Sequence, residues 1–252
     1  MRKGFLAATI VASGIAGFMA VPVQAVQADE MSADEKKAIE SVIHDYLLNN
    51  PEVVVEAIRK FQASQETARA EAARQRLTEL RTPLERNEGT PVIGNPDGDV
   101  TVVEFFDYRC GYCKRVHEAL TDAVKSDGKV RLVLKEFPIL GPDSVTATKA
   151  ALGVFYTSPD KYPAFHDALM TSRGNLDEAR VMEIAVSVGL KADAVKTAMK
   201  DPRVELEIQH NMALAQALDI SGTPAFVVGN ELVPGAIDRA AFDELIKNAR
   251  GG

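Results

Sequence analysis

The only two cysteines in this 252-residue sequence are Cys110 and Cys113, which are separated by Gly111 and Tyr112. A thiol pair at this spacing can exchange disulfides with another molecule, bind a soft metal ion or form a short structural bridge. Disulfide exchange needs one cysteine that attacks and a second cysteine close enough to resolve the mixed disulfide. The sequence around the pair must therefore decide among these three kinds of chemistry.

The cysteine pair follows a β-rich run, residues 100–107, and opens a predicted helix. A Cys-x-x-Cys pair placed between a strand and a helix is typical of a thioredoxin-like redox motif. Backbone N–H groups at a helix N-terminus stabilise a thiolate and lower the thiol pKa. We therefore predict that Cys110 attacks, that the more buried Cys113 resolves, and that Gly111 and Tyr112 tune the redox potential.

The metal and structural alternatives have less support in the sequence. A structural zinc site needs four ligands, and His117 is the one histidine that lies about one turn beyond Cys113. No His-x-x-x-His pair is present to complete such a set. A bridge that closes so short a loop gains little stability from chain entropy. We therefore expect no metal and no cofactor apart from a reversible Cys110–Cys113 disulfide.

Two other positions fit redox chemistry. Glu104 places a carboxylate in an otherwise apolar strand, six residues before Cys110. Burial would raise its pKa and suit it to proton transfer, whereas on an alternating strand it would face solvent. Pro224 ends a Ser-Gly-Thr-Pro stretch directly before an apolar run. A proline bond at a strand start can be cis and hold a defined position, although an ordinary turn also explains the four residues.

The elements around the cysteines predict an α/β domain. The strand that leads to Cys110 is followed by a helix, a second strand, several helical stretches, a hairpin and a last helix. A region rich in proline and glycine precedes this domain, and a long helical region comes before it. The predicted segments are a helical oligomerisation region at 32–86, a linker and domain start at 87–99, a thioredoxin-like domain at 100–250, and a helical insertion at about 140–218.

The helical region has an apolar face without an obvious core. Ser32 and Glu35 have the spacing of a capping box. The apolar residues that follow recur at three- and four-residue steps and predict one apolar stripe. They are Ile39, Val42, Ile43, Tyr46, Leu47, Val54, Ile58 and Phe61. Two helices cannot bury this stripe alone, so it either packs on the following domain or joins other copies in a coiled-coil-like oligomer.

The first residues predict export. Arg2 and Lys3 precede an uncharged apolar run, and small residues follow up to Ala25 and Ala28. This pattern is typical of a signal peptide at 1–25, with cleavage at 28 as the other option, and less so of a membrane anchor. Loss of Arg2 and Lys3 would change the formal charge from −7 to −9. An acidic, exported protein without a basic cluster predicts a periplasmic location and no nucleic-acid partner.

Around the cysteines, the sequence resembles the DsbA family of thioredoxin-fold oxidoreductases. The resemblance is carried by Glu104-Phe-Phe-Asp-Tyr-Arg-Cys110-Gly-Tyr-Cys113-Lys and by Gly222-Thr223-Pro224-Ala225. It covers about residues 91–250 and implies a thioredoxin fold with an inserted helical domain. It also implies that Cys110 is the nucleophile, that Glu104 is the buried acid, and that Thr223 contacts substrate backbone beside a cis Pro224.

The stretch His44-Asp-Tyr-Leu-Leu-Asn-Asn-Pro-Glu-Val53 resembles the suppressor-of-copper-sensitivity protein C branch of that family. This resemblance implies a homotrimer that acts as a disulfide isomerase or reductase, with a membrane-bound thiol reductase as partner and a link to copper tolerance. We expect an exported isomerase that acts on misoxidised proteins, using disulfide-containing or thiol proteins as substrates. The alternatives are a DsbA-like disulfide oxidase and a copper(I)-binding protein that uses the same thiols.

Overall fold

The computed structural model describes residues 31–251, and within them the chain divides into two compact units. One unit ends at Phe61 and the other begins at Gln62, inside a continuous helix. The helical region predicted at 32–86 therefore contributes residues to both units. The predicted signal peptide lies outside the described residues. No helix between residues 31 and 251 is long and apolar enough to cross a membrane.

The first unit contains α1 (Ala33–Asn49) and the first part of α2 (Pro51–Glu79). α1 begins with the predicted capping box, in which Ser32 and Glu35 satisfy each other's backbone N–H groups. Pro51 starts α2, where the missing N–H of proline costs no helical hydrogen bond. No side chain of α1 is buried.

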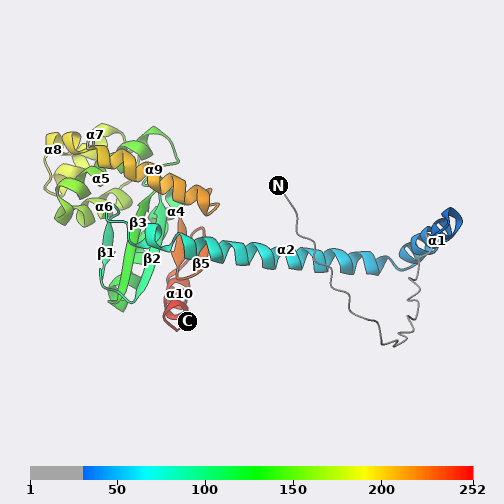
Figure 1. Ribbon diagram of the computed structural model, residues 1–252. Coiled ribbons are helices and arrows are strands. Elements are labelled where there is room, and N and C mark those ends of the chain that lie inside the picture. The colour runs from blue at the N-terminus through cyan, green and yellow to red at the C-terminus, as the bar shows by residue number, and fades with distance from the viewer. Residues whose placement is uncertain (1–30, 252) are drawn as a thin grey trace, which may run out of the picture. The chain divides into compact units, whose positions relative to one another are not determined.

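The second unit is built on a five-stranded sheet with the order β1-β3-β2-β4-β5 (Figure 1). β2 pairs in parallel with β3, and all other neighbouring strands are antiparallel. β2 is rich in β-branched and aromatic residues and is buried on both faces, as expected of a central strand. The strands are β1 (Val92–Gly94), β2 (Val100–Phe106), β3 (Val130–Glu136), β4 (Ala225–Val228) and β5 (Glu231–Pro234).

Residues of β2 alternate between the two faces of the sheet and reach two separate cores. Val102 and Phe106 pack in the larger core, with side chains from α4 (Gly111–Asp127) and α10 (Arg239–Gly251). Val103 and Phe105 pack in a second core with Leu77 at the end of α2. The period of two places Glu104 on the same face as Val102 and Phe106, towards α4.

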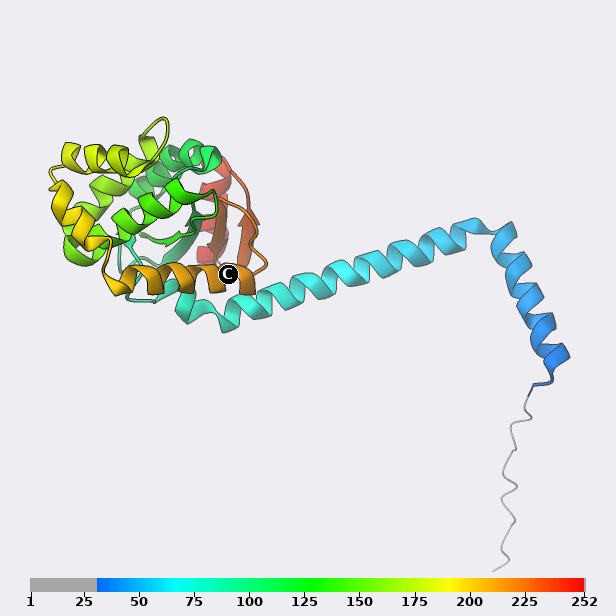
Figure 2. The ribbon, with the colours of Figure 1, turned by 90° about the horizontal axis from the view of Figure 1, so that it is seen from above.

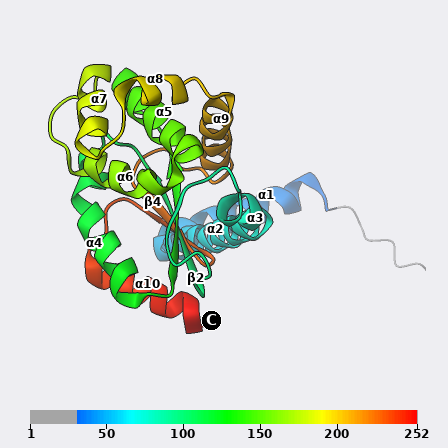
Figure 3. The same cartoon turned by 90° about the vertical axis from the view of Figure 1, so that its left-hand side faces the viewer.

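A helical insertion joins β3 to β4 and covers one end of the sheet (Figure 3). Its helices are α5 (Pro142–Thr157), η1 (Pro159–Lys161), α6 (Tyr162–Thr171), α7 (Glu178–Ser187), α8 (Ala192–Ala198) and α9 (Pro202–Ala217). A short helix, α3 (Arg81–Glu85), connects α2 to β1. The fold is the predicted one: a thioredoxin-type α/β sheet with a helical insertion, preceded by a helical N-terminal region.

Candidate active site

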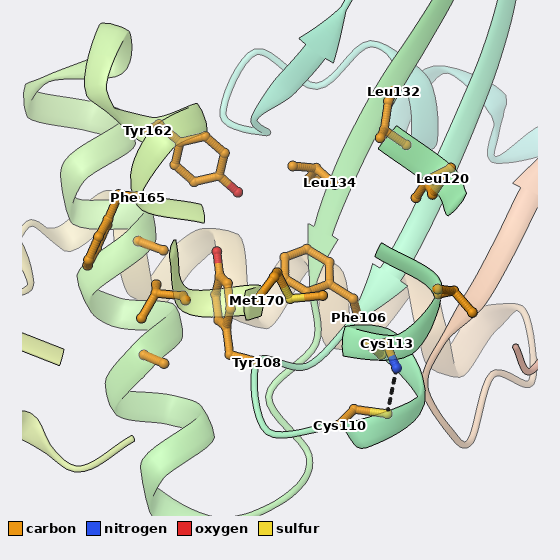
Figure 4. Packing of buried hydrophobic residues seen from close by; sticks show 14 of the residues in the cluster. Phe106, Tyr108, Cys110, Cys113, Leu120, Leu132, Leu134, Tyr162, Phe165 and Met170 are labelled. Carbon is orange, nitrogen blue, oxygen red and sulfur yellow. Dashed lines mark hydrogen bonds between the residues drawn. The ribbon is translucent and has the colours of Figure 1, made fainter. Parts of the chain in front are cut away.

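The backbone places Cys110 at the start of α4. β2 ends at Phe106, a turn follows, and Cys110 is the N-cap residue of the helix with extended backbone angles. The Cys113 backbone N–H donates a hydrogen bond to the Cys110 sulfur over 3.4 Å (Figure 4). The Cys110 sulfur thus takes the position that a serine or aspartate oxygen occupies in an ordinary N-cap. Both cysteines are free thiols in the structure.

This position stabilises the thiolate form of Cys110. Its pKa is lowered to about 5, chiefly by a hydrogen bond from the Cys113 thiol. The backbone N–H groups of Cys113 and Tyr112 lower the pKa further, while partial burial opposes them. A thiol with this pKa is almost entirely ionised at neutral pH and is therefore ready to attack a disulfide.

Cys113 has the opposite environment, although it lies only one helical turn away. It is fully buried in the larger core, and its pKa is raised well above the ordinary value. The largest cause is the hydrogen bond that it donates to Cys110, followed by burial and by the charge of Glu104. One thiol of the pair is thus ready to react while the other keeps its proton.

Glu104 is buried, with 1% of its surface exposed, and neither carboxylate oxygen has a hydrogen-bond partner. Burial, together with the negative charge of Cys110, raises its pKa to about 8. A carboxyl with that pKa can accept or release a proton near neutral pH. The carboxylate therefore does not face solvent, which the sequence had left as an alternative.

The Thr223–Pro224 peptide bond is cis and lies directly before β4. The Cys110 sulfur lies 3.2 Å from the Thr223 carbonyl oxygen, to which the protonated thiol donates a hydrogen bond. This contact joins residues 113 positions apart in the sequence. The structure thus brings together four of the predicted site residues: Glu104, Cys110, Cys113 and Thr223.

The two residues between the cysteines lie on the surface. Tyr112 is 57% exposed, and the Arg115 guanidinium lies 4.9 Å from the centre of its ring. A side chain added at Gly111 would meet no atom within 4 Å. Both positions therefore lie at the surface beside Cys110, and neither one helps to form the core.

Asp107 is a positioning residue that the sequence did not single out. Its carboxylate is fully buried and accepts backbone hydrogen bonds from Arg109, Ile139 and Leu140, and one from the Ser144 hydroxyl. These bonds tie the turn before Cys110 to the loop between β3 and α5. The visible signal was an aspartate at the end of a strand, three residues before the first cysteine.

His117, which the sequence offered as a third metal ligand, has another partner. Its Nε2 lies 2.9 Å from the Asp167 carboxylate on α6, and its ring is buried. Within residues 31–251, no group of three or more His, Cys, Asp or Glu side chains is arranged to hold a metal ion.

Comparisons with known proteins agree with this geometry. Residues 101–247 match the DSBA-like thioredoxin domain, and residues 35–68 match the copper resistance protein ScsC N-terminal domain. The chain is 31% identical over 149 residues to the thiol:disulfide interchange protein DsbA of Bordetella pertussis, covering 57% of this chain and 69% of that protein.

Two solved structures are also similar. A thioredoxin-like oxidoreductase from Silicibacter pomeroyi is 44% identical, with a TM-score of 0.66 over 68% of this chain and 98% of that one. Proteus mirabilis ScsC in a transitional conformation is 29% identical, with a TM-score of 0.66 over 88% of this chain and 99% of that one. The chain therefore belongs to the DsbA-like thioredoxin family, as a thiol–disulfide oxidoreductase of DsbA/ScsC type with a ScsC-type helical domain before its catalytic domain.

Proposed function

We propose that the protein is a disulfide isomerase and reductase that acts on misoxidised proteins through its Cys-Gly-Tyr-Cys site. The observation that carries disulfide exchange at this site is the unequal pair of thiols at the start of α4, and the helical N-terminal region supports isomerisation. Cys110 has a pKa of about 5, whereas the pKa of Cys113 is raised well above the ordinary value. This asymmetry supports Cys110 as the attacking thiol and Cys113 as the resolving thiol.

The first step is attack by the Cys110 thiolate on a substrate disulfide. A bond forms between the Cys110 sulfur and one substrate sulfur, and the other substrate sulfur leaves as a thiolate. In isomerisation, a second substrate cysteine attacks the mixed disulfide and forms a new substrate disulfide. Cys110 is released as a thiolate, so the enzyme gains and loses no electrons over the cycle.

In reduction, Cys113 resolves the mixed disulfide. Its proton passes to Glu104 in the ionised form, which is a minor fraction at neutral pH because the pKa of Glu104 is about 8. The Cys113 thiolate attacks the Cys110 sulfur, forms the Cys110–Cys113 disulfide and releases the substrate as a thiol. Two electrons must then be supplied from a thiol reductant, and a membrane-bound thiol reductase is the partner that the resemblance implies. No bound cofactor is needed for either route.

The helical N-terminal region supports isomerisation over simple exchange. The apolar side chains of α1 and early α2 are exposed, including Val42, Tyr46 and Phe61. Residues 35–68 match the ScsC N-terminal domain. We propose that this region joins copies into a homotrimer, the number three resting on the resemblance alone. Several catalytic domains on one assembly raise the effective concentration of thiols around one misfolded substrate.

Export to the periplasm is part of the same proposal. It is supported by the signal-peptide pattern of the first 28 residues and by the chemistry itself, because protein disulfides persist in oxidising compartments.

A disulfide oxidase is the second candidate, and the low pKa of Cys110 favours it. A stabilised thiolate favours the reduced enzyme and makes its disulfide a stronger oxidant. The copper(I) alternative would use two thiolates as soft ligands, and it stays a prediction. The equilibrium of the Cys110–Cys113 disulfide with glutathione separates isomerase from oxidase, because an isomerase needs Cys110 to be reduced in the cell.

A trapping experiment tests the proposal. The Cys113→Ser enzyme cannot resolve the mixed disulfide. Incubation with a scrambled, fully oxidised protein should therefore accumulate a covalent complex, and dithiothreitol should reduce it. Cys110→Ser is the matched control and should trap nothing. Equal trapping by the two variants would contradict the assignment of Cys110 as nucleophile.

A further inference from the structure

A cavity of about 440 Å³ lies where the helical insertion meets α4 and β1. The yellow and yellow-green helices of the insertion lie to one side of the sheet in Figure 2, and α6 packs against α4. Cavities of about 300–1,000 Å³ are typical of small-molecule sites. Cys110, Cys113 and Thr223 do not line this cavity, so it is separate from the site of disulfide exchange.

The lining of the cavity combines apolar and ionisable side chains. Most of the apolar side chains come from β1 and α4, and the two imidazoles come from α4 and α6. The apolar residues are Val92, Ile93, Val124 and Pro163, and the ionisable residues are His117, Lys125, His166 and Asp167. A molecule with an apolar body and polar ends fits this combination.

His166 is the lining residue whose hydrogen bonding is incomplete. Only 1% of its surface is exposed, and its Nε2 has no hydrogen-bond partner among residues 31–251. Its other ring nitrogen, Nδ1, lies 3.0 Å from the Tyr108 hydroxyl. A buried polar atom without a partner is unfavourable, and a ligand that supplies the missing hydrogen bond recovers that free energy.

The state of the His166 ring indicates which ligand group fits it. Burial and the neighbouring His117 lower its pKa to about 3, so the ring is neutral. The Tyr108 hydroxyl can donate to His166 Nδ1 or to the Glu136 carboxyl, 3.4 Å away. Nε2 is a donor in the first case and an acceptor in the second. A hydroxyl group both donates and accepts, so it satisfies Nε2 in either tautomer.

The opening of the cavity carries two charges. Asp167 is exposed, and its carboxylate lies 2.9 Å from His117 Nε2. Lys125 is exposed and forms no ion pair with any residue between 31 and 251. α4 rises about 1.5 Å per residue, so Lys125 lies about 12 Å beyond His117 along the helix. An anionic group of a ligand would therefore lie towards Lys125 and away from Asp167.

We propose that this cavity binds a small apolar hydroxy acid, with its hydroxyl against His166 and its carboxylate towards Lys125. The body of the molecule packs on Ile93 and Val124. The ligand is not the disulfide substrate, so the site adds to the proposed function and does not depend on it. A phenol ring with a short acid chain opposite its hydroxyl has this chemistry, and 3-(4-hydroxyphenyl)propionate is the probe.

The test titrates the unchanged full chain with three probes by calorimetry. They are 3-(4-hydroxyphenyl)propionate, 3-phenylpropionate, which lacks the hydroxyl, and 3-(4-hydroxyphenyl)propionamide, which lacks the charge. The hydroxy acid should bind at least tenfold more tightly than 3-phenylpropionate and at least threefold more tightly than the amide. No binding of the hydroxy acid, or equal affinity for it and 3-phenylpropionate, would overturn the proposal.

Nitrogen-15 spectra of the imidazole rings locate the bound probe. The Nε2 resonance of His166 should shift on addition of either hydroxylated probe. Binding without that shift would place the probe elsewhere and contradict the site.

Thr121→Trp should fill the cavity, because Thr121 is a half-buried lining residue of α4. It should weaken binding of the hydroxy acid at least tenfold, and unchanged affinity would overturn the proposal. Asp122→Trp is the matched control, since Asp122 is an exposed neighbour outside the cavity, and it should leave the affinity unchanged. If Thr121→Trp does not fold, the ranking of the three probes decides.

A charge variant tests the carboxylate end. Lys125→Met should lower the affinity for the hydroxy acid to that for the amide and leave the amide unaffected. Lys129→Met removes an exposed charge outside the cavity and is the control. An equal loss for acid and amide in Lys125→Met would contradict the proposed orientation. Binding does not use the Cys110 thiol, so failure of the trapping experiment would reject the proposed function and leave this site standing.

Discussion

Most apolar side chains of residues 33–61 are exposed, whereas most of those in the unit that begins at Gln62 are buried. In the first, Val42, Tyr46 and Phe61 are each more than half exposed, and no side chain of α1 is buried. In the second, two cores enclose the sheet from both faces. Burial of one large apolar side chain stabilises a folded or associated state by about 1.5–3 kcal/mol. The difference teaches that the catalytic unit buries its apolar side chains within itself, whereas α1 and early α2 leave theirs exposed.

The largest effect is expected when the attacking thiol is removed from the catalytic unit and the helical region is left unchanged. Cys110→Ser should lower the rate of insulin disulfide reduction by about 1,000-fold or more, because the attacking thiolate is lost. The mass in solution, measured by light scattering, should not change. A retained rate would show that the nucleophile lies elsewhere, and a changed mass would show that the two regions are not separable.

The next effect concerns the thiolate. The absorbance of Cys110 at 240 nm should titrate with a midpoint near pH 5, because its pKa is lowered to about 5 by the Cys113 hydrogen bond. Cys110→Ala should remove this transition and serves as the control. A midpoint near the ordinary thiol value would mean that the start of α4 does not activate the site.

Association should fail when charge is placed on the exposed apolar face. Val42→Asp combined with Phe61→Asp should weaken self-association by about 100-fold or more, since a buried unpaired carboxylate is strongly unfavourable. Sedimentation should then show a single chain. Lys60→Asp with Lys37→Asp is the matched control on exposed charged positions. The rate with a small disulfide should be equal in all of these proteins, and a shared loss of that rate would break the comparison.

Glu104 should make the protein less stable as pH rises once the Cys110 thiol is removed. Its folded pKa of about 8 lies above its ordinary value of 4.5, chiefly because of burial. Between these values the folded state binds the extra proton, so the Glu104 contribution to the free energy of unfolding falls as pH rises, by on the order of 3 kcal/mol between pH 5 and pH 8.5. The lowered pKa of Cys110 acts with the opposite sign in the reduced protein, so urea unfolding is measured in a Cys110→Ser background. Glu104→Leu should remove most of the decline there.

Glu118→Leu, at an exposed position of α4, is the control and should keep the decline. Glu104→Leu should also slow the release of substrate from Cys110, because Cys113 then lacks a proton acceptor. An unchanged pH dependence in Glu104→Leu would remove Glu104 from the account.

The smallest effect is expected at the start of α1. Ser32→Ala removes the capping-box hydroxyl and should destabilise α1 by about 1 kcal/mol. Circular dichroism should show less helix in the monomeric Val42→Asp/Phe61→Asp background, where no association compensates. Ser41→Ala, in the middle of the helix, should not reduce the helix content.

Much of the fold was predictable because its signals are local. The β-branched run of β2, the cysteine spacing and the Ser32–Glu35 capping box each specify a strand, a helix start or a cap within a few residues. β1 was not predicted as a strand, because it has only three residues and depends on pairing with β3.

The candidate site residues could be named from the sequence, but the contacts between them could not. The burial of Glu104 follows from the packing of α4 and α10 on one face of the sheet, and the Thr223 carbonyl meets Cys110 across 113 residues of sequence. The role of Asp107 depends on a loop beyond β3. Leu77 was assigned to a helical region before the catalytic domain, but the structure shows it inside the second core. Contacts between residues so far apart in the chain produce no periodic pattern in a single sequence.

The central claim is that the catalytic unit exchanges disulfides and that self-association through the helical region makes the protein an isomerase. The most direct measurement compares refolding of scrambled, fully oxidised ribonuclease by the unchanged chain and by Val42→Asp/Phe61→Asp, each scaled to its rate with a small disulfide. We predict that the scaled isomerase activity falls at least tenfold in the dissociated variant while the small-disulfide rate is unchanged. Equal scaled activity in a protein shown to be monomeric would contradict the account.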